Sequence, residues 1–280
     1  MGFFNFEKEG PGVSKNGPKK KGLFLFFELL GRKIGKFCEI NMLYFLVSLP
    51  MIIISFFAAG FFMRYGLTIL QRDIGDPNYF TQVCLFVAFM FVVIIGSGPA
   101  SASLAYFNRC AVREEATFLF ADFKEQFKKN FIQGMIVGVI NTVVIFVMIF
   151  AMEFYIQLSV LYPAYSDFCS AGIIIMLAAC VVFSSAMLYI YQLMVTFENS
   201  VLQLYKNSLI LALMNMPMNI LLMVIVLFLN FPLFTVLSPI ASPVLSFVCW
   251  VAIVRFVFEF YTARVVDKKI IKNINKEGKK

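Results

Sequence analysis

Long apolar runs separated by short polar segments dominate the chain from residue 37 to residue 261. A helix needs about 20 apolar residues to cross the roughly 30 Å hydrocarbon layer of a bilayer. Six runs reach that length, and they cover roughly residues 37–62, 80–107, 131–155, 171–196, 209–229 and 234–261. The pattern therefore predicts an all-α membrane protein whose six-helix transmembrane bundle occupies residues 23–265.

The two ends of the chain are basic and lack this pattern. Residues 1–22 mix Gly, Pro and Lys without periodicity, which predicts a disordered cytoplasmic tail, and residues 266–280 are predicted to form a second basic cytoplasmic tail. Residues 23–36 place large apolar side chains beside Arg32, Lys33 and Lys36. This pattern predicts a helix lying in the membrane interface. An alternative stays open, in which these residues are the first turns of a longer first span.

The distribution of Lys and Arg predicts which way the helices face. Of the 24 basic residues, all except Arg64 and Arg72 fall in segments that lie on one side if the six runs cross the membrane in turn. Cytoplasmic segments carry the excess of Lys and Arg in membrane proteins. We therefore expect a multi-pass membrane protein with both termini in the cytoplasm.

Composition narrows the possible functions. The chain is 61% hydrophobic and 14% charged, which excludes an ordinary soluble domain. The net charge of +8 is concentrated beside the apolar runs, so anionic lipid headgroups are the expected partner and nucleic acid is not. The chain has no histidine, no cluster with metal-ligand spacing and no phosphate-binding glycine loop, and its six cysteines are expected to be small buried side chains. We therefore expect no enzyme activity, no catalytic residue, no metal and no cofactor.

Small residues and a proline interrupt the second run, at Gly96, Gly98, Pro99 and Ser101. Two interpretations stay open: a notch in which another helix packs closely, or a solute contact at a broken helix. Asn215 and Asn219 share a predicted helix face across Pro217. They also have two interpretations, as a pair that joins helices or as part of a substrate path.

The segment that follows the second run has an amphipathic pattern. Phe123, Phe127 and Phe131 recur every fourth residue between charged side chains, which predicts an interfacial helix over residues 122–131. Membrane anchoring alone is one interpretation. Contact with a cytoplasmic partner is the other, and its candidate residues are Arg109, Asp122, Lys128, Lys129 and Asn130.

Acidic residues avoid the middle of the predicted spans, where a proton-coupled carrier would need one. Glu259 falls near the end of the sixth predicted span, and Arg255 precedes it by about one helical turn. We expect these two residues to form an ion pair at the membrane interface.

Several short motifs occur in an order that resembles the YesL-like bacterial membrane proteins, a domain of unknown function common in Firmicutes. The motifs are Asn41, Ser48-Leu49-Pro50, Gly98-Pro99-Ala100-Ser101-Ala102, Arg109, Asp122-Phe123, Lys129-Asn130-Phe131 and Lys206-Asn207. Typical members bring the second and third motifs close together, whereas residues 51–97 separate them in this chain. The resemblance therefore carries no expectation for the helix arrangement before Gly96.

The resemblance implies a multi-pass protein of a bacterial plasma membrane and a role, but no reaction. Genes of that family often lie beside carbohydrate ABC importers and glycan-degrading enzymes. By analogy, the protein is expected to be a non-enzymatic accessory of carbohydrate ABC uptake that contacts the permease subunits. The alternative is a stand-alone carrier or channel for a small solute.

Overall fold

The computed structural model describes residues 22–65, 98–235 and 241–271, which form helices joined by short turns and contain no strand. The described elements are α1 (Leu23–Tyr65), a helix over residues 98–113, α4 (Leu119–Lys129), α5 (Phe131–Leu161), the 3-10 turn η1 (Pro163–Tyr165), α6 (Ser166–Thr196), α7 (Val201–Met214), α8 (Met216–Thr235), α9 (Ala241–Leu245), the π-helical turn η2 (Ser246–Trp250), α10 (Val251–Val266) and the π-helical turn η3 (Asp267–Ile271).

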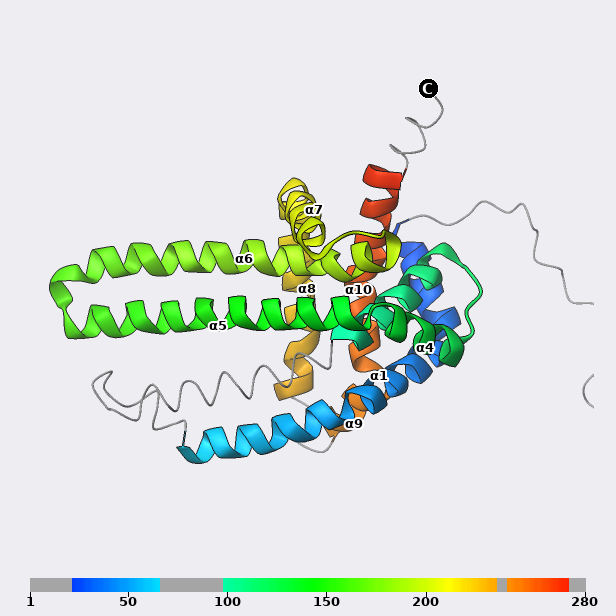
Figure 1. The fold of residues 1–280 in the computed structure, drawn as a ribbon, viewed down its shortest axis with the longest axis horizontal. Coiled ribbons are helices and arrows are strands. Elements are labelled where there is room, and N and C mark those ends of the chain that lie inside the picture. Colours follow the sequence, from blue (N-terminus) through cyan, green and yellow to red (C-terminus); the bar gives the residue numbers. More distant parts are fainter. Residues whose placement is uncertain (1–21, 66–97, 236–240, 272–280) are drawn as a thin grey trace, which may run out of the picture.

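Helices α5 and α6 form a long antiparallel hairpin (Figure 1). Each has 31 residues and is therefore about 46 Å long at 1.5 Å per residue, which exceeds the thickness of the hydrocarbon layer. Large apolar side chains remain exposed along them, among them Val160, Ile174 and Ile175. Such exposure disfavours a position in water but suits contact with lipid tails. The hairpin thus fits a membrane-embedded element.

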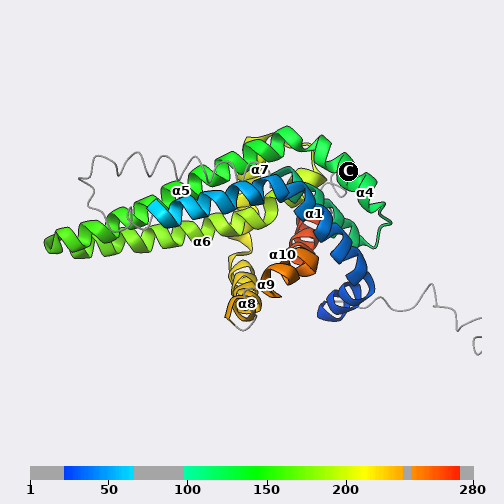
Figure 2. The same ribbon diagram turned by 90° about the horizontal axis from the view of Figure 1, so that it is seen from below.

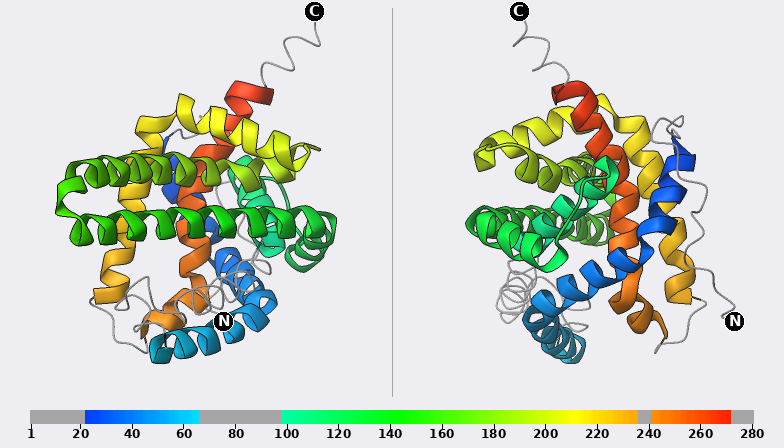
Figure 3. Two further views of the ribbon diagram at one scale, coloured as in Figure 1. Left: turned by 60° about the vertical axis from the view of Figure 1, so that its left-hand side comes forward. Right: turned by 90° about the vertical axis from the view of Figure 1, so that its right-hand side faces the viewer.

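The described helices do not run side by side as a simple bundle. Helices α8 and α10 cross the α5–α6 hairpin steeply (Figures 1 and 3), and α1 curves along another side of it (Figure 2). Among the described residues, three helices are long and apolar enough to cross a membrane: Phe131–Leu161, Pro163–Thr196 and Ser246–Ile270. The pair α7 and α8, bent by 91°, gives a fourth if it counts as one span. These helices fit a membrane protein, and both the number six and the cytoplasmic termini stay predictions.

Several element boundaries differ from the sequence-based expectation. Residues 23–36 and 37–62 belong to one continuous helix, α1, so the expected interfacial helix is not a separate element. The expected fifth span, residues 209–229, is divided at Asn215 by the bend between α7 and α8. Residues 266–271 of the expected basic tail are still helical. The first expected tail, up to residue 21, and most of the second expected span lie outside the described residues.

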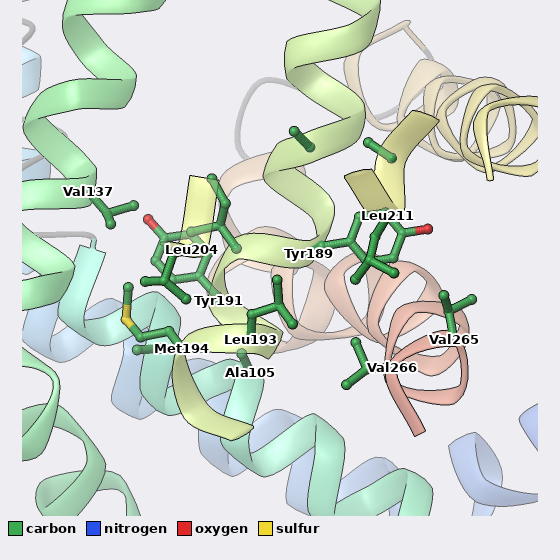
Figure 4. Close-up of a cluster of buried hydrophobic side chains, with 14 residues drawn as sticks. Ala105, Val137, Tyr189, Tyr191, Leu193, Met194, Leu204, Leu211, Val265 and Val266 are labelled. Atoms are coloured by element: carbon green, nitrogen blue, oxygen red, sulfur yellow. The ribbon is translucent and has the colours of Figure 1, made fainter. Parts of the chain in front are cut away.

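Two hydrophobic clusters hold the helices together. The first surrounds the C-terminal half of α6, where Tyr189, Ile190 and Leu193 are fully buried against α7, α10 and the helix over residues 98–113 (Figure 4). The second joins α1, α4, α10 and that same helix. At its centre the ring of Phe37 lies 4.7 Å from that of Phe256 and 5.6 Å from that of Phe107. Both the helix over residues 98–113 and α10 contribute to the two clusters, so these two helices connect them.

Asn41 of α1 joins the π-helical turn η2. Its side-chain amide nitrogen donates to the carbonyl oxygens of Ser246 and Phe247, at 2.8 and 2.7 Å. Its side-chain oxygen accepts from the backbone N–H of Ala252, at 2.8 Å. A π-helical turn shifts the hydrogen-bond register of a helix. Asn41 therefore provides partners for backbone groups at this irregular point, inside an apolar region where unpaired groups are costly.

Candidate functional site

A buried carboxylate, Glu259, lies on the last helix that is long and apolar enough to cross a membrane, and its position near a span end stays a prediction. The apolar helix covers Ser246–Ile270, and Glu259 is 4% exposed. The sequence pattern placed the end near residue 261 because Arg264 follows. In the structure α10 continues to Val266, and the Arg264 guanidinium lies 3.9 Å from the centre of the Phe260 ring.

Glu259 is paired on both oxygens. Arg255 Nε lies 3.5 Å from Glu259 Oε1, as expected for an ion pair one turn apart, and Asn108 Nδ2 donates to Oε2 at 2.5 Å. Arg255 also donates from Nη1 to Ser101 Oγ at 2.9 Å, and its guanidinium lies over the Tyr191 ring. We call Ser101, Asn108, Tyr191, Arg255 and Glu259 the charge cluster. Burying an ionisable group in an apolar layer costs free energy unless the group is paired. The cluster therefore either stabilises the packing of these helices or contacts a solute.

Two buried amide oxygens beside the charge cluster have no hydrogen-bond donor among the described residues: Asn108 Oδ1 and Gln192 Oε1. Both residues are at most 1% exposed, and Gln192 Nε2 donates to the Ala105 carbonyl, one turn before Asn108. Buried polar atoms are rarely left without a partner.

The small-residue candidates lie in different environments. Gly98 packs directly on α5, because a Cβ added there would overlap the carbonyl oxygen of Gly134, and a Cβ on Gly134 would come within 2.8 Å of the Pro99 nitrogen. This contact agrees with the packing interpretation. Pro99 is buried beside it, whereas Ser101 belongs to the charge cluster. Gly96 lies outside the described residues.

Asn215 and Asn219 lie at the bend between α7 and α8. Asn215 donates to the Leu211 carbonyl and accepts from Lys269 Nζ at 2.8 Å. Asn219 donates to the Ala212 carbonyl and accepts from Tyr189 Oη at 2.8 Å. The amides therefore provide partners for backbone carbonyls beside the bend. The bend has a local sequence signal, because Pro217 has no N–H to donate to the carbonyl four residues earlier and so interrupts the helix just before it.

Polar contacts fasten the end of the helix over residues 98–113. Arg109 Nη1 donates to the Val195 carbonyl at 2.7 Å, and Arg113 pairs with Asp267. Arg109, expected on a partner surface, thus makes an internal contact with α6. Burial raises the pKa of the neighbouring Cys110 thiol to about 11 and lowers the pKa of Lys33, whose Nζ donates to the Ala111 carbonyl.

Helix α4 covers most of the expected amphipathic helix over residues 122–131, but it begins earlier, at Leu119, and ends at Lys129, so Phe131 is the first residue of α5. The ring of Phe127 lies 6.4 Å from that of Phe123 and 5.5 Å from that of Phe131, and Phe123 is buried. Asp122 accepts from the Phe118 backbone N–H at 2.8 Å, while Lys128 and Lys129 are exposed. Asn130 is buried and donates to Gln126.

A cavity of about 470 Å³ lies between the α4–α5 junction and the turn that joins α6 to α7. It is lined by Gln126, Lys129, Asn130, Gln133 and residues 194–200. Gln133 Nε2 donates to the Asn199 carbonyl at 2.6 Å, which holds the two walls together. No motif in the sequence pointed to this cavity, because its walls are more than 60 residues apart in the chain.

Among the described residues, no group of three or more Cys, Asp or Glu side chains could hold a metal ion. Neither curated proteins nor solved structures give a match to the chain. Residues 78–152 match a family model described as a protein of unknown function, DUF624, and this stretch contains the helix over residues 98–113, α4 and most of α5. Over these residues the chain is therefore similar to an uncharacterised family.

Proposed function

We propose that this is a multi-pass protein of a bacterial plasma membrane that assists carbohydrate uptake by an ABC-type importer, without catalysing a reaction of its own. The carbohydrate role is taken from the resemblance to YesL-like proteins. The long apolar helices support the membrane location.

The observation that carries an accessory role is the outer face of α4. The helix is anchored by the buried Phe123, so its opposite side is held at a fixed position. That side exposes Lys124, Lys128 and Lys129 together with one acidic residue, Glu125, so its net charge is positive. A fixed basic surface at the predicted cytoplasmic side suits an acidic patch on a permease subunit, because complementary charge steers and orients association.

Co-purification from native membranes tests this role. A tagged protein should bring down permease subunits, and replacing all three α4 lysines by alanine should reduce the yield several-fold. The paired variant Lys206→Ala/Lys268→Ala, which removes exposed lysines elsewhere, should leave the yield unchanged. Absence of every permease subunit from the native complex would overturn the proposal.

A stand-alone carrier for a small solute is the second candidate, favoured by the bend at Asn215 and the buried Glu259. Broken helices and intramembrane carboxylates recur along transport paths. Liposomes containing the purified protein should then show solute flux that Glu259→Gln, Gly98→Ala or Asn215→Leu reduces. A lack of flux for sugars, amino acids and inorganic ions would eliminate this candidate.

A further inference from the structure

We propose that the cavity between the α4–α5 junction and the α6–α7 turn binds a neutral sugar, a mono- or disaccharide. The inference rests on the proposed function for its physiological role, because an accessory of carbohydrate uptake that binds sugar can respond to its presence. The ligand class itself is argued from the residues that line the cavity.

The lining is rich in neutral amides. Gln126, Asn130, Gln133 and Asn199 each carry a side chain with both donor and acceptor atoms. Sugar hydroxyl groups also donate and accept, so amides match them better than a set of like charges would. The volume of about 470 Å³ falls within the 300–1,000 Å³ typical of small-molecule sites.

The charged side chains that line the cavity do not favour binding of an anion or a cation. Lys129 and Glu198 are the charged residues of the lining, and both are exposed. Their opposite charges leave little net field for a phosphate or a metal ion, and exposed charges are screened by salt. A neutral hydroxylated ligand therefore fits the lining better than an anion or a cation.

The amides are already oriented. Asn130 is 4% exposed and donates to both the backbone oxygen and the side-chain oxygen of Gln126, at 3.0 and 3.3 Å. Gln133 is fixed by its 2.6 Å bond to the Asn199 carbonyl. Side chains that are positioned before binding lose less freedom when the ligand arrives. The cavity thus has the features of a formed site.

The cavity is also connected to the charge cluster. Val195 lines the cavity, and its carbonyl accepts the 2.7 Å bond from Arg109. Arg109 directly follows Asn108, which holds Glu259. A ligand that moves residues 194–200 would therefore act on a helix that joins both hydrophobic clusters.

Calorimetric titration of the full chain in nanodiscs tests the inference. The ligands are glucose, N-acetylglucosamine and maltose, with glucose 6-phosphate, inorganic phosphate and glutamate for comparison. We expect a neutral sugar to bind and Gln126→Leu to weaken binding at least about tenfold, a loss that corresponds to about 1.4 kcal/mol. Gln157→Leu, the same change near the far end of α5, should leave the affinity unchanged.

Three outcomes would overturn the inference: no neutral sugar binds to the folded protein, the anions alone bind, or Gln126→Leu and Asn199→Ala retain full affinity. Folding of each variant is checked by its thermal unfolding midpoint. Co-purification with permease subunits is measured on the same variants. Sugar binding that fails while co-purification persists would refute this site and leave the accessory role standing, and the reverse result would refute the accessory role alone.

Discussion

The side-chain amide of Asn108 donates a 2.5 Å hydrogen bond to the carboxylate of Glu259, across 151 positions of the chain. Together with Arg255, it pairs a carboxylate that is only 4% exposed. This arrangement makes the charge cluster sensitive to the loss of one partner, and the first prediction concerns that sensitivity.

Glu259→Leu should destabilise the protein by about 3 kcal/mol or more, because it leaves the Arg255 guanidinium without its counter-charge. The double variant Arg255→Leu/Glu259→Leu should be more stable than either single variant, since no unpaired charge then remains. Unfolding of the detergent-solubilised chain measures both. A double variant as unstable as the sum of the two singles would contradict the buried pairing.

Asn41→Leu should destabilise the protein by about 2–4 kcal/mol, because it removes the partners of three backbone groups around η2. The adjacent change Met42→Leu is the control, since Met42 is 43% exposed and should tolerate it. Hydrogen exchange followed by mass spectrometry should show faster exchange at Ala252 in the Asn41 variant. Unchanged protection there would contradict the contact.

Gly98→Ala and Gly134→Ala should each destabilise the protein by about 1–3 kcal/mol, because the new methyl group would force two backbones apart. Gly31→Ala serves as the matched control. Nothing lies within 4 Å of a Cβ at Gly31, and the site is helical, so alanine should stabilise it by about 0.5–1 kcal/mol. Equal effects at the three positions would refute the close approach.

The Cys110 thiol should make stability fall at high pH. Burial raises its pKa from 9.0 to about 11, so the folded protein holds this proton more tightly than the unfolded chain does. The resulting stabilisation is fully present below pH 9 and is lost as the pH rises through 11. Between pH 9 and 11 the unfolding midpoint of the native protein should therefore fall more than that of Cys110→Ala. A constant difference would contradict the burial.

Local sequence patterns sufficed for the hairpin of α5 and α6. An unbroken apolar run begins after Lys129-Asn130, another ends near Thr196, and Pro163 marks the turn between them. The same pattern missed the bend at Asn215, because the residues on both sides of it are apolar. Met216-Pro217 carried the signal, yet a proline within an apolar run is also compatible with a continuous span.

The candidate site was less predictable than the helices. The Arg255–Glu259 pair follows from helical spacing, but its burial depends on Asn108 and Ser101, which lie more than 150 positions earlier. Likewise, the cavity exists because the start of α5 packs beside the end of α6. Such contacts depend on how helices pack, and hydrophobic periodicity does not encode that packing.

The hydrogen bonds between the Asn41 side chain and the backbone around η2 also have a consequence for biosynthesis. Its acceptors and donor lie 205 to 211 positions later, so at least 205 further residues must be synthesised before that amide can reach any of them. Until then the nascent α1 holds a polar group with no lasting partner. A premature stop before residue 246 would make that state permanent and leave the truncated product to quality-control proteases.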